Sequence, residues 1–185
     1  MKRITIAASL ALSLSCLGAA TAQEVTFVGQ SVAAAAEAEK KSTIIPAGAQ
    51  LVVLERWINK GDTFSAKPLP LWPPAKYEGR LQGALGFISS TDFDGGILLH
   101  SCQTNNMRDK FTSRDANCEG HRHVGYAPII GFIAGTQLPG TVPLYRCQRG
   151  GLSPGNWSDH FDSVDVNCEG VTNPANDGII GYIWQ

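Results

Sequence analysis

The chain of 185 residues lacks the features that mark several large classes of protein. Its longest apolar run, residues 4–17, is shorter than the roughly 20 apolar residues that a membrane span needs, so we expect no span. No stretch of residues 51–185 keeps a helical period over three turns, which argues against a helical bundle. Charged residues make up only 17% of the chain and are almost balanced, with 15 basic and 16 acidic side chains. Nucleic acids are therefore not expected partners.

The N-terminus has the pattern of a secretory signal peptide. A basic start is followed by the apolar residues 4–17 and by a small-x-small cleavage site at residues 20–22. We expect residues 1–22 to be removed and the product to be secreted, into the extracellular space or the periplasm. An acylated Cys16 is the alternative, but the chain has serine where a lipobox has leucine. Removing the signal takes away two basic residues and leaves 13 against 16 acidic ones, a net charge of −3.

Residues 23–50 are expected to form a linker between the signal and the main domain. Their alanine-rich and charged part, residues 33–41, favours a helix. That part is shorter than the roughly 12 residues that an isolated helix needs, and it has little apolar surface with which to dock. The linker is therefore predicted to be only partly helical.

The remaining 135 residues repeat a motif about 45 residues long. Each copy contains a Leu-x-x-Cys or Leu-x-x-Trp block, an Asp-x-Phe block, a Glu-Gly block and a Gly-aromatic-Ile block, in that order. The copies are residues 51–95, 96–140 and 141–185, and their first blocks begin at Leu54, Leu99 and Leu144. The first copy is degenerate and has no cysteine.

The copies also predict how the four cysteines of the mature chain are paired. The second copy holds Cys102 and Cys118, and the third holds Cys147 and Cys168, at matching places. The first copy has a tryptophan and a tyrosine there, so each pair is present or absent as a unit. We predict one disulfide within each copy, Cys102–Cys118 and Cys147–Cys168. Each should contribute roughly 3 kcal/mol to stability.

The blocks are typical of short strands. Each copy opens with an apolar, partly β-branched run, at residues 51–54, 96–99 and 142–145. The Asp-x-Phe and Gly-aromatic-Ile blocks predict further strands, which makes three or four per copy. Gly86, Gly131 and Gly181 indicate bulges or close backbone approach. We predict an all-β domain of three pseudo-repeats, a β-trefoil, with a three-bladed propeller-like arrangement or a small sandwich as alternatives.

The third copy carries Leu-Tyr-Arg, Asp-His-Phe, Cys-Glu-Gly and Gly-Tyr in order, and with these motifs the chain resembles a family of secreted bacterial and fungal repeat modules. That family has no settled activity, and its members are often appended to extracellular hydrolases. The resemblance covers residues 51–185. The first copy departs from it, with Glu55 in place of tyrosine and Thr63 in place of histidine. The resemblance implies an accessory or binding module and carries over no catalytic residue.

The acid of the Asp-x-Phe block recurs in all three copies. It can anchor the start of a strand, or it can accept hydrogen bonds from sugar hydroxyls beside an aromatic ring. The third copy is the richest, because an asparagine, a tryptophan and a histidine accompany its aspartate. The predicted ligand-binding residues are Asp62, Asp109, Asn156, Trp157, Asp159 and His160.

Two patterns are compatible with a metal ion. His121 and His123 have strand spacing, and Asp-x-Asn-x-Glu recurs at residues 115–119 and 165–169. We favour a solvated loop for the histidines. For the acidic pattern we favour a polar turn whose side chains bond their own backbone. No metal and no other cofactor is predicted.

A Gly-x-Ser-x-Gly pattern at residues 151–155 matches a nucleophile elbow, but Pro154 and the lack of a strand-to-helix context argue against catalysis at Ser153. We therefore predict a secreted, non-catalytic, monomeric binding module, lectin-like, for glycans of a cell wall or a host surface. One alternative is an inhibitor that presents the loop 150–155 to an extracellular hydrolase. The other is a small hydrolase.

Overall fold

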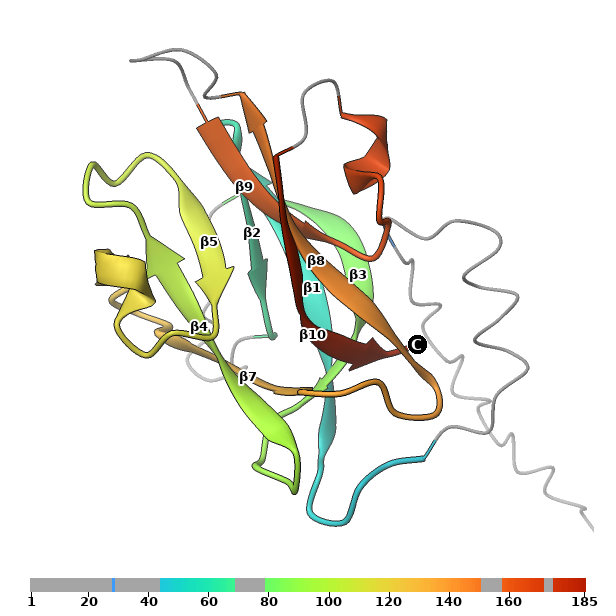
Figure 1. Cartoon of the computed structure of the whole chain (residues 1–185). Helices are drawn as coiled ribbons and strands as arrows, with labels where there is room; N and C mark the ends of the chain where they lie inside the picture. The colour runs from blue at the N-terminus through green and yellow to red at the C-terminus, as the bar shows by residue number, and fades with distance from the viewer. Residues whose placement is uncertain (1–27, 29–43, 69–78, 151–157, 172–174) are drawn as a thin grey trace, which may run out of the picture.

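The computed structural model is all-β, as predicted (Figure 1). The structure describes residues 28, 44–68, 79–150, 158–171 and 175–185. Residues 1–22, where the signal peptide is predicted, lie outside these ranges. No helix of the described residues is long and apolar enough to cross a bilayer.

Ten strands form one antiparallel sheet within the described part of the chain. They are β1 (Leu51–Asn59), β2 (Asp62–Ala66), β3 (Arg80–Ser89), β4 (Gly96–Gln103), β5 (Lys110–Ser113), β6 (Arg122–His123), β7 (Ile129–Ala134), β8 (Thr141–Gly150), β9 (Ser158–Ser163) and β10 (Ala175–Trp184). Two short 3₁₀ turns, η1 (Cys118–Gly120) and η2 (Cys168–Gly170), follow β5 and β9.

The long strands β1, β4 and β8 organise the sheet. Each pairs with the strand that follows it, β2, β5 or β9, and also with a later strand, β3, β7 or β10. The strands β3, β7 and β10 each pair with the other two, through contacts such as Ser89 opposite Phe132 and Tyr182 opposite Ala134. Segments far apart in the sequence are thereby joined by backbone hydrogen bonds.

The core takes the same block positions from each third of the sequence. Leu54, Leu99 and Leu144 are completely buried and pack together. The core is completed from the Gly-aromatic-Ile blocks and nearby positions by Leu85, Ile88, Ile130, Ile133, Val164, Ile180 and Ile183. Burying each such aliphatic side chain stabilises the fold by about 1.5–3 kcal/mol. The apolar residues of the repeated blocks thus meet in one core.

Gly86, Gly131 and Gly181 lie at bulges of the sheet, where the strand register shifts. Their φ angles are +156°, +158° and +152°, a region that side chains disfavour. A Cβ atom on Gly86 would lie 2.5 Å from the carbonyl oxygen of Trp184. The prediction of bulges and close backbone approach is confirmed.

The predicted disulfides are both present, as Cys102–Cys118 and Cys147–Cys168. All four cysteines are fully buried. Each bond ties a long strand, β4 or β8, to the 3₁₀ turn of the same copy. Two disulfides are consistent with an extracellular protein.

Described residues ahead of β1 form hydrogen bonds with the sheet. The backbone N–H of Val28 donates to the carbonyl of Ala84 at 2.7 Å, and the Val28 side chain packs against the core. The carbonyl of Ile44 accepts a hydrogen bond from Trp184 Nε1 at 3.2 Å. Most of residues 23–50, where the linker is predicted, lie outside the described residues.

Candidate functional site

Four of the six predicted ligand-binding residues lie together, at the place where β2, β5 and β9 contact one another. Asp62 begins β2, Asp109 directly precedes β5, and Asp159 and His160 lie in β9. One carboxylate oxygen of each aspartate lies within 4.8 Å of those of the other two. We call these three residues the aspartate ring. Asn156 and Trp157 lie outside the described residues, as do Ser153 and most of the loop 150–155.

The ring is built from a cycle of hydrogen bonds between strands. Each carboxylate accepts the backbone N–H that follows the ring aspartate of the next copy in the cycle. The donors and acceptors are Lys110 and Asp62 at 2.8 Å, His160 and Asp109 at 2.9 Å, and Thr63 and Asp159 at 2.5 Å. These bonds join β2 to β5, β5 to β9 and β9 to β2.

Each ring carboxylate also meets a basic side chain. The pairs are Lys110 Nζ with Asp62 at 2.5 Å, His160 Nδ1 with Asp109 at 2.5 Å, and Arg149 Nη2 with Asp159 at 2.6 Å. Three basic groups thus face three acids. A metal ion at the ring would have to displace these groups, so the donor set does not fit a metal. Because the carboxylate oxygens are occupied and Asp109 and Asp159 are buried, the ring serves to join the strands.

His160 links the ring to the surface. Burial lowers the pKa of His160, but the hydrogen bond and the charge of Asp109 outweigh burial and leave that pKa above its ordinary value. Nε2 of His160 lies 3.8 Å from a carboxylate oxygen of Asp177, which acts in the same direction. The imidazole therefore stays protonated to a higher pH than a free histidine does.

Asp177 also lines a groove of about 500 Å³, which we call the Arg146 groove. The loop after β5 supplies Arg114 and Asp115, η1 supplies Glu119, β8 supplies Arg146, and β10 supplies Asp177. The isoleucines 97, 179 and 180 complete its apolar part. A second hollow, beside Phe64, has a volume of about 10 Å³ and can hold no more than a water molecule.

Arg146 is held in place at the base of this groove. Its Nη1 and Nη2 donate to the two carboxylate oxygens of Glu119 at 2.6 and 3.0 Å, and its Nε donates to Asp177 at 2.8 Å. The guanidinium also lies 5.4 Å from the centre of the Phe111 ring. The hydrogen bond from Arg146 lowers the pKa of Glu119, which keeps this acid ionised. The groove therefore presents fixed charges.

Arg114 differs from Arg146 in having no such partners. Its side chain is exposed, and no other described residue makes a hydrogen bond or an ion pair with it. It is a donor on the groove that remains available to a ligand.

Family models, curated proteins and solved structures contain no match to this chain.

The two Asp-x-Asn-x-Glu patterns form the predicted polar turns. Asp115 Oδ1 accepts the N–H of Asn117 at 2.9 Å, and Oδ2 accepts the N–H of Glu119 at 3.0 Å. Residues 165–169 repeat both bonds, at 2.9 and 3.1 Å. The aspartate oxygens therefore fold the turn, and each turn delivers its glutamate to an arginine of another copy.

His121 and His123 do not act as a pair. The ring of His121 lies edge-on to Phe111, with 5.6 Å between the ring centres. Nδ1 of His123 lies 3.4 Å from Sγ of Cys118, and its ring centre lies 5.4 Å from that of His100. Sequence reasoning passed over His100 and Arg146. The signal for the groove in the sequence was an arginine that recurs in the first block, as Arg56 and Arg146, and a glutamate that recurs before glycine, as at Glu119 and Glu169.

Proposed function

We propose that the chain is a secreted, non-catalytic module that binds a neutral glycan of a cell wall or a host surface in the Arg146 groove. One observation carries this proposal: the groove combines accessible acceptors with Arg114, an exposed donor that makes no side-chain hydrogen bond or ion pair with the described residues. The side chains of Glu119 and Asp177 are 42% and 32% exposed. Sugar hydroxyls both donate and accept hydrogen bonds, so donors and acceptors set side by side suit them.

The charges of the groove favour a neutral ligand over a polyanion. Its lining holds two basic residues, Arg114 and Arg146, against three acidic ones, Asp115, Glu119 and Asp177. An acidic polysaccharide or a nucleic acid would meet this excess of negative charge. The 43% exposed Ile179 adds apolar surface for the C–H face of a sugar ring.

The groove is rigid before a ligand arrives. Arg146 is fixed by Glu119 and Asp177, and the Cys102–Cys118 disulfide anchors η1, which carries Glu119. A site whose polar groups are already ordered loses less conformational entropy on binding. Asn156 and Trp157 remain part of the proposal, because they directly precede β9, in which His160 faces Asp177.

We also infer that residues 51–185 form a β-trefoil of three repeats, at 51–95, 96–140 and 141–185. The cycle of hydrogen bonds in the aspartate ring supports this inference, since each repeat donates to another in turn. The mutual pairing of β3, β7 and β10 supports it at another part of the sheet. In this fold the Arg146 groove lies between the second and third repeats.

A glycan array and a cell-wall pull-down with the full chain test the proposed function. We expect retention on neutral glycans, reduced at least tenfold by R114A or D177N. Arg108 is an exposed arginine outside the groove lining, so R108A is the matched control and should bind like the unaltered protein. Blank results in both assays, or equal losses in R114A and R108A, would refute binding in this groove.

A further inference from the structure

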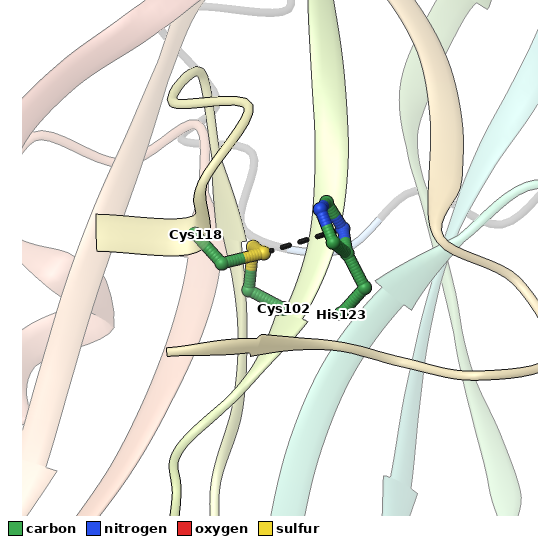
Figure 2. Close-up of side chains that lie close together, drawn as sticks. All are labelled: Cys102, Cys118 and His123. Atoms are coloured by element: carbon green, nitrogen blue, oxygen red, sulfur yellow. Dashed lines mark hydrogen bonds between the residues drawn. A yellow bond between two sulfur atoms is a disulfide. The ribbon is translucent and has the colours of Figure 1, made fainter. Parts of the chain in front are cut away.

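One of the two disulfides lies against a histidine. Figure 2 shows the ring of His123 beside the Cys102–Cys118 bond, with Nδ1 3.4 Å from Sγ of Cys118. The two sulfur atoms and a ring nitrogen of His123 all lie within 4.8 Å of one another. Cysteine thiolates, which form when a disulfide is reduced, and imidazole nitrogens are donors that zinc prefers in proteins.

His123 is oriented as metal-binding histidines are. Its Nε2 lies 2.9 Å from the carbonyl oxygen of Ala116. A carbonyl can only accept, so Nε2 carries a hydrogen, and in the neutral imidazole Nδ1 then presents its lone pair toward the sulfur. Histidine ligands of metals commonly donate their second ring N–H to a backbone carbonyl in this way, which sets the tautomer and the ring direction.

A second histidine, His100, lies beside this group without belonging to the set of atoms within 4.8 Å of one another. His100 stands two residues before Cys102 on β4, and residues at this spacing lie on one face of a strand. Its ring centre is 5.4 Å from that of His123. His100 is 8% exposed, and its Nδ1 is buried with no hydrogen-bond partner in the described part of the chain. Such a buried nitrogen costs stability unless a ligand uses it.

The other disulfide has no such neighbours in the sequence. Tyr145 stands two residues before Cys147, where the first pair has His100. Asn173 stands five residues after Cys168, where the first pair has His123. Because Cys147–Cys168 ties β8 to η2 without histidines, His100 and His123 are not needed for the bond between strand and turn.

We propose that Cys102, Cys118, His123 and His100 form a site that becomes able to bind zinc when the Cys102–Cys118 disulfide is reduced. A dithiol reductant supplies two electrons and two protons to the S–S bond, yields two thiols, and itself becomes a disulfide. Zn²⁺ then displaces the two thiol protons, which pass to solvent, and binds two thiolates and two imidazole nitrogens. The disulfide and the zinc site exclude each other, so zinc in this site protects the reduced state from reoxidation.

The first test uses the full chain treated with tris(2-carboxyethyl)phosphine, with thiols counted before zinc is added. Competition against a chromophoric chelator measures zinc affinity, and the visible spectrum of bound Co²⁺ reports thiolate ligation. We expect one metal ion per reduced chain and none on the oxidised chain. The C147S/C168S variant should retain the site and the C102S/C118S variant should lose it.

The exposed histidines supply the matched pair of variants. H123A should weaken zinc binding 10- to 100-fold, while H121A, two residues away, should leave it unchanged. These two variants keep the test sharp if a cysteine variant does not fold. Three results would overturn the proposal: no zinc on the reduced protein, equal zinc binding by H123A and H121A, or a Cys102–Cys118 bond that millimolar reductant does not open. Glycan binding does not enter any of these measurements.

Discussion

Arg56 holds both carboxylate oxygens of Glu169, which lies 113 positions away in the sequence. Nη1 and Nη2 donate at 2.5 and 3.0 Å, and Nη1 also donates to the carbonyl of Asp162. The bond fastens β1 to η2. Arg146 and Glu119 repeat the arrangement between β8 and η1, closer to solvent.

These two pairs should differ in their contribution to stability. The side chains of Arg56 and Glu169 are 7% and 28% exposed, against 13% and 42% for Arg146 and Glu119. Removing the arginine of the more buried pair leaves the less hydrated carboxylate unpaired. We expect R56Q to lower the free energy of unfolding by about 3 kcal/mol and R146Q by about 1 kcal/mol. Urea denaturation measures both, and a larger loss in R146Q would contradict this ranking.

The pair of His160 and Asp109 should make stability depend on pH. The folded-state pKa of His160 is raised above 6.5, so the stabilisation is fully present below pH 6.5 and is lost as pH rises through the folded-state pKa. We expect H160Q to be less stable than the unaltered protein by about 1–2 kcal/mol below pH 6.5, with the difference shrinking at alkaline pH. Thermal unfolding across this range measures it. H121Q, at an exposed histidine, is the control, and a difference that grows with pH would refute the assignment.

The buried carboxylate of Asp162 should destabilise the folded protein at neutral pH. Burial raises its pKa, and its Oδ2 makes no hydrogen bond of good geometry within the described part of the chain. Ser65 and Thr112 stand at the same place in the other Asp-x-Phe strands and are neutral. D162N keeps an acceptor for the Thr112 hydroxyl, which donates at 2.6 Å, and removes the charge.

We therefore expect D162N to stabilise the protein by about 1 kcal/mol at pH 7. Because the folded-state pKa of Asp162 is raised, ionisation of this acid destabilises the unaltered protein as pH rises above 3.8, the ordinary value. The stability advantage of D162N should therefore vanish in acid. Unfolding curves at pH 4 and pH 7 measure the difference. A destabilised D162N at pH 7 would show that the charge is needed by the neighbouring arginines.

A comparison of Gly86 with Gly95 distinguishes two causes of destabilisation by a side chain, an unfavourable backbone conformation and a steric clash. Both have positive φ, +156° and +77°, but a Cβ on Gly95 would meet no atom within 4 Å, whereas one on Gly86 would collide with the carbonyl of Trp184. We expect G95A to cost about 1 kcal/mol and G86A about 3 kcal/mol or more. Thermal melts rank them, and equal losses would show that the sheet can open at Trp184.

The sequence predicted those features that depend on residues within one copy of the motif. Both disulfides followed from cysteines that occur or are missing together, and the bulges followed from a glycine repeated at one place. The first strands were predicted too short, since β1 continues beyond Leu54 through the charged pair Glu55 and Arg56 and ends at Asn59. A strand extends wherever a partner backbone offers hydrogen bonds, and the pairing of Glu55–Asn59 with β2 offers them whatever the side chains are.

Whether the aspartates of the Asp-x-Phe blocks can bind a ligand, by contrast, depends on contacts between residues far apart in the sequence. The asparagine, tryptophan and histidine that accompany Asp159 in the sequence predicted a ligand site, but whether its oxygens are free depends on Thr63 and Arg149, which belong to other strands. The same holds for Arg146, which is fixed by η1, and for His100, which meets His123 across β4 and β6. Residues close together in the sequence determine local geometry, because turns and bulges depend on their immediate neighbours. Which polar atoms remain available is decided only when the strands pack, because each hydrogen bond uses a partner that lies far away in the chain.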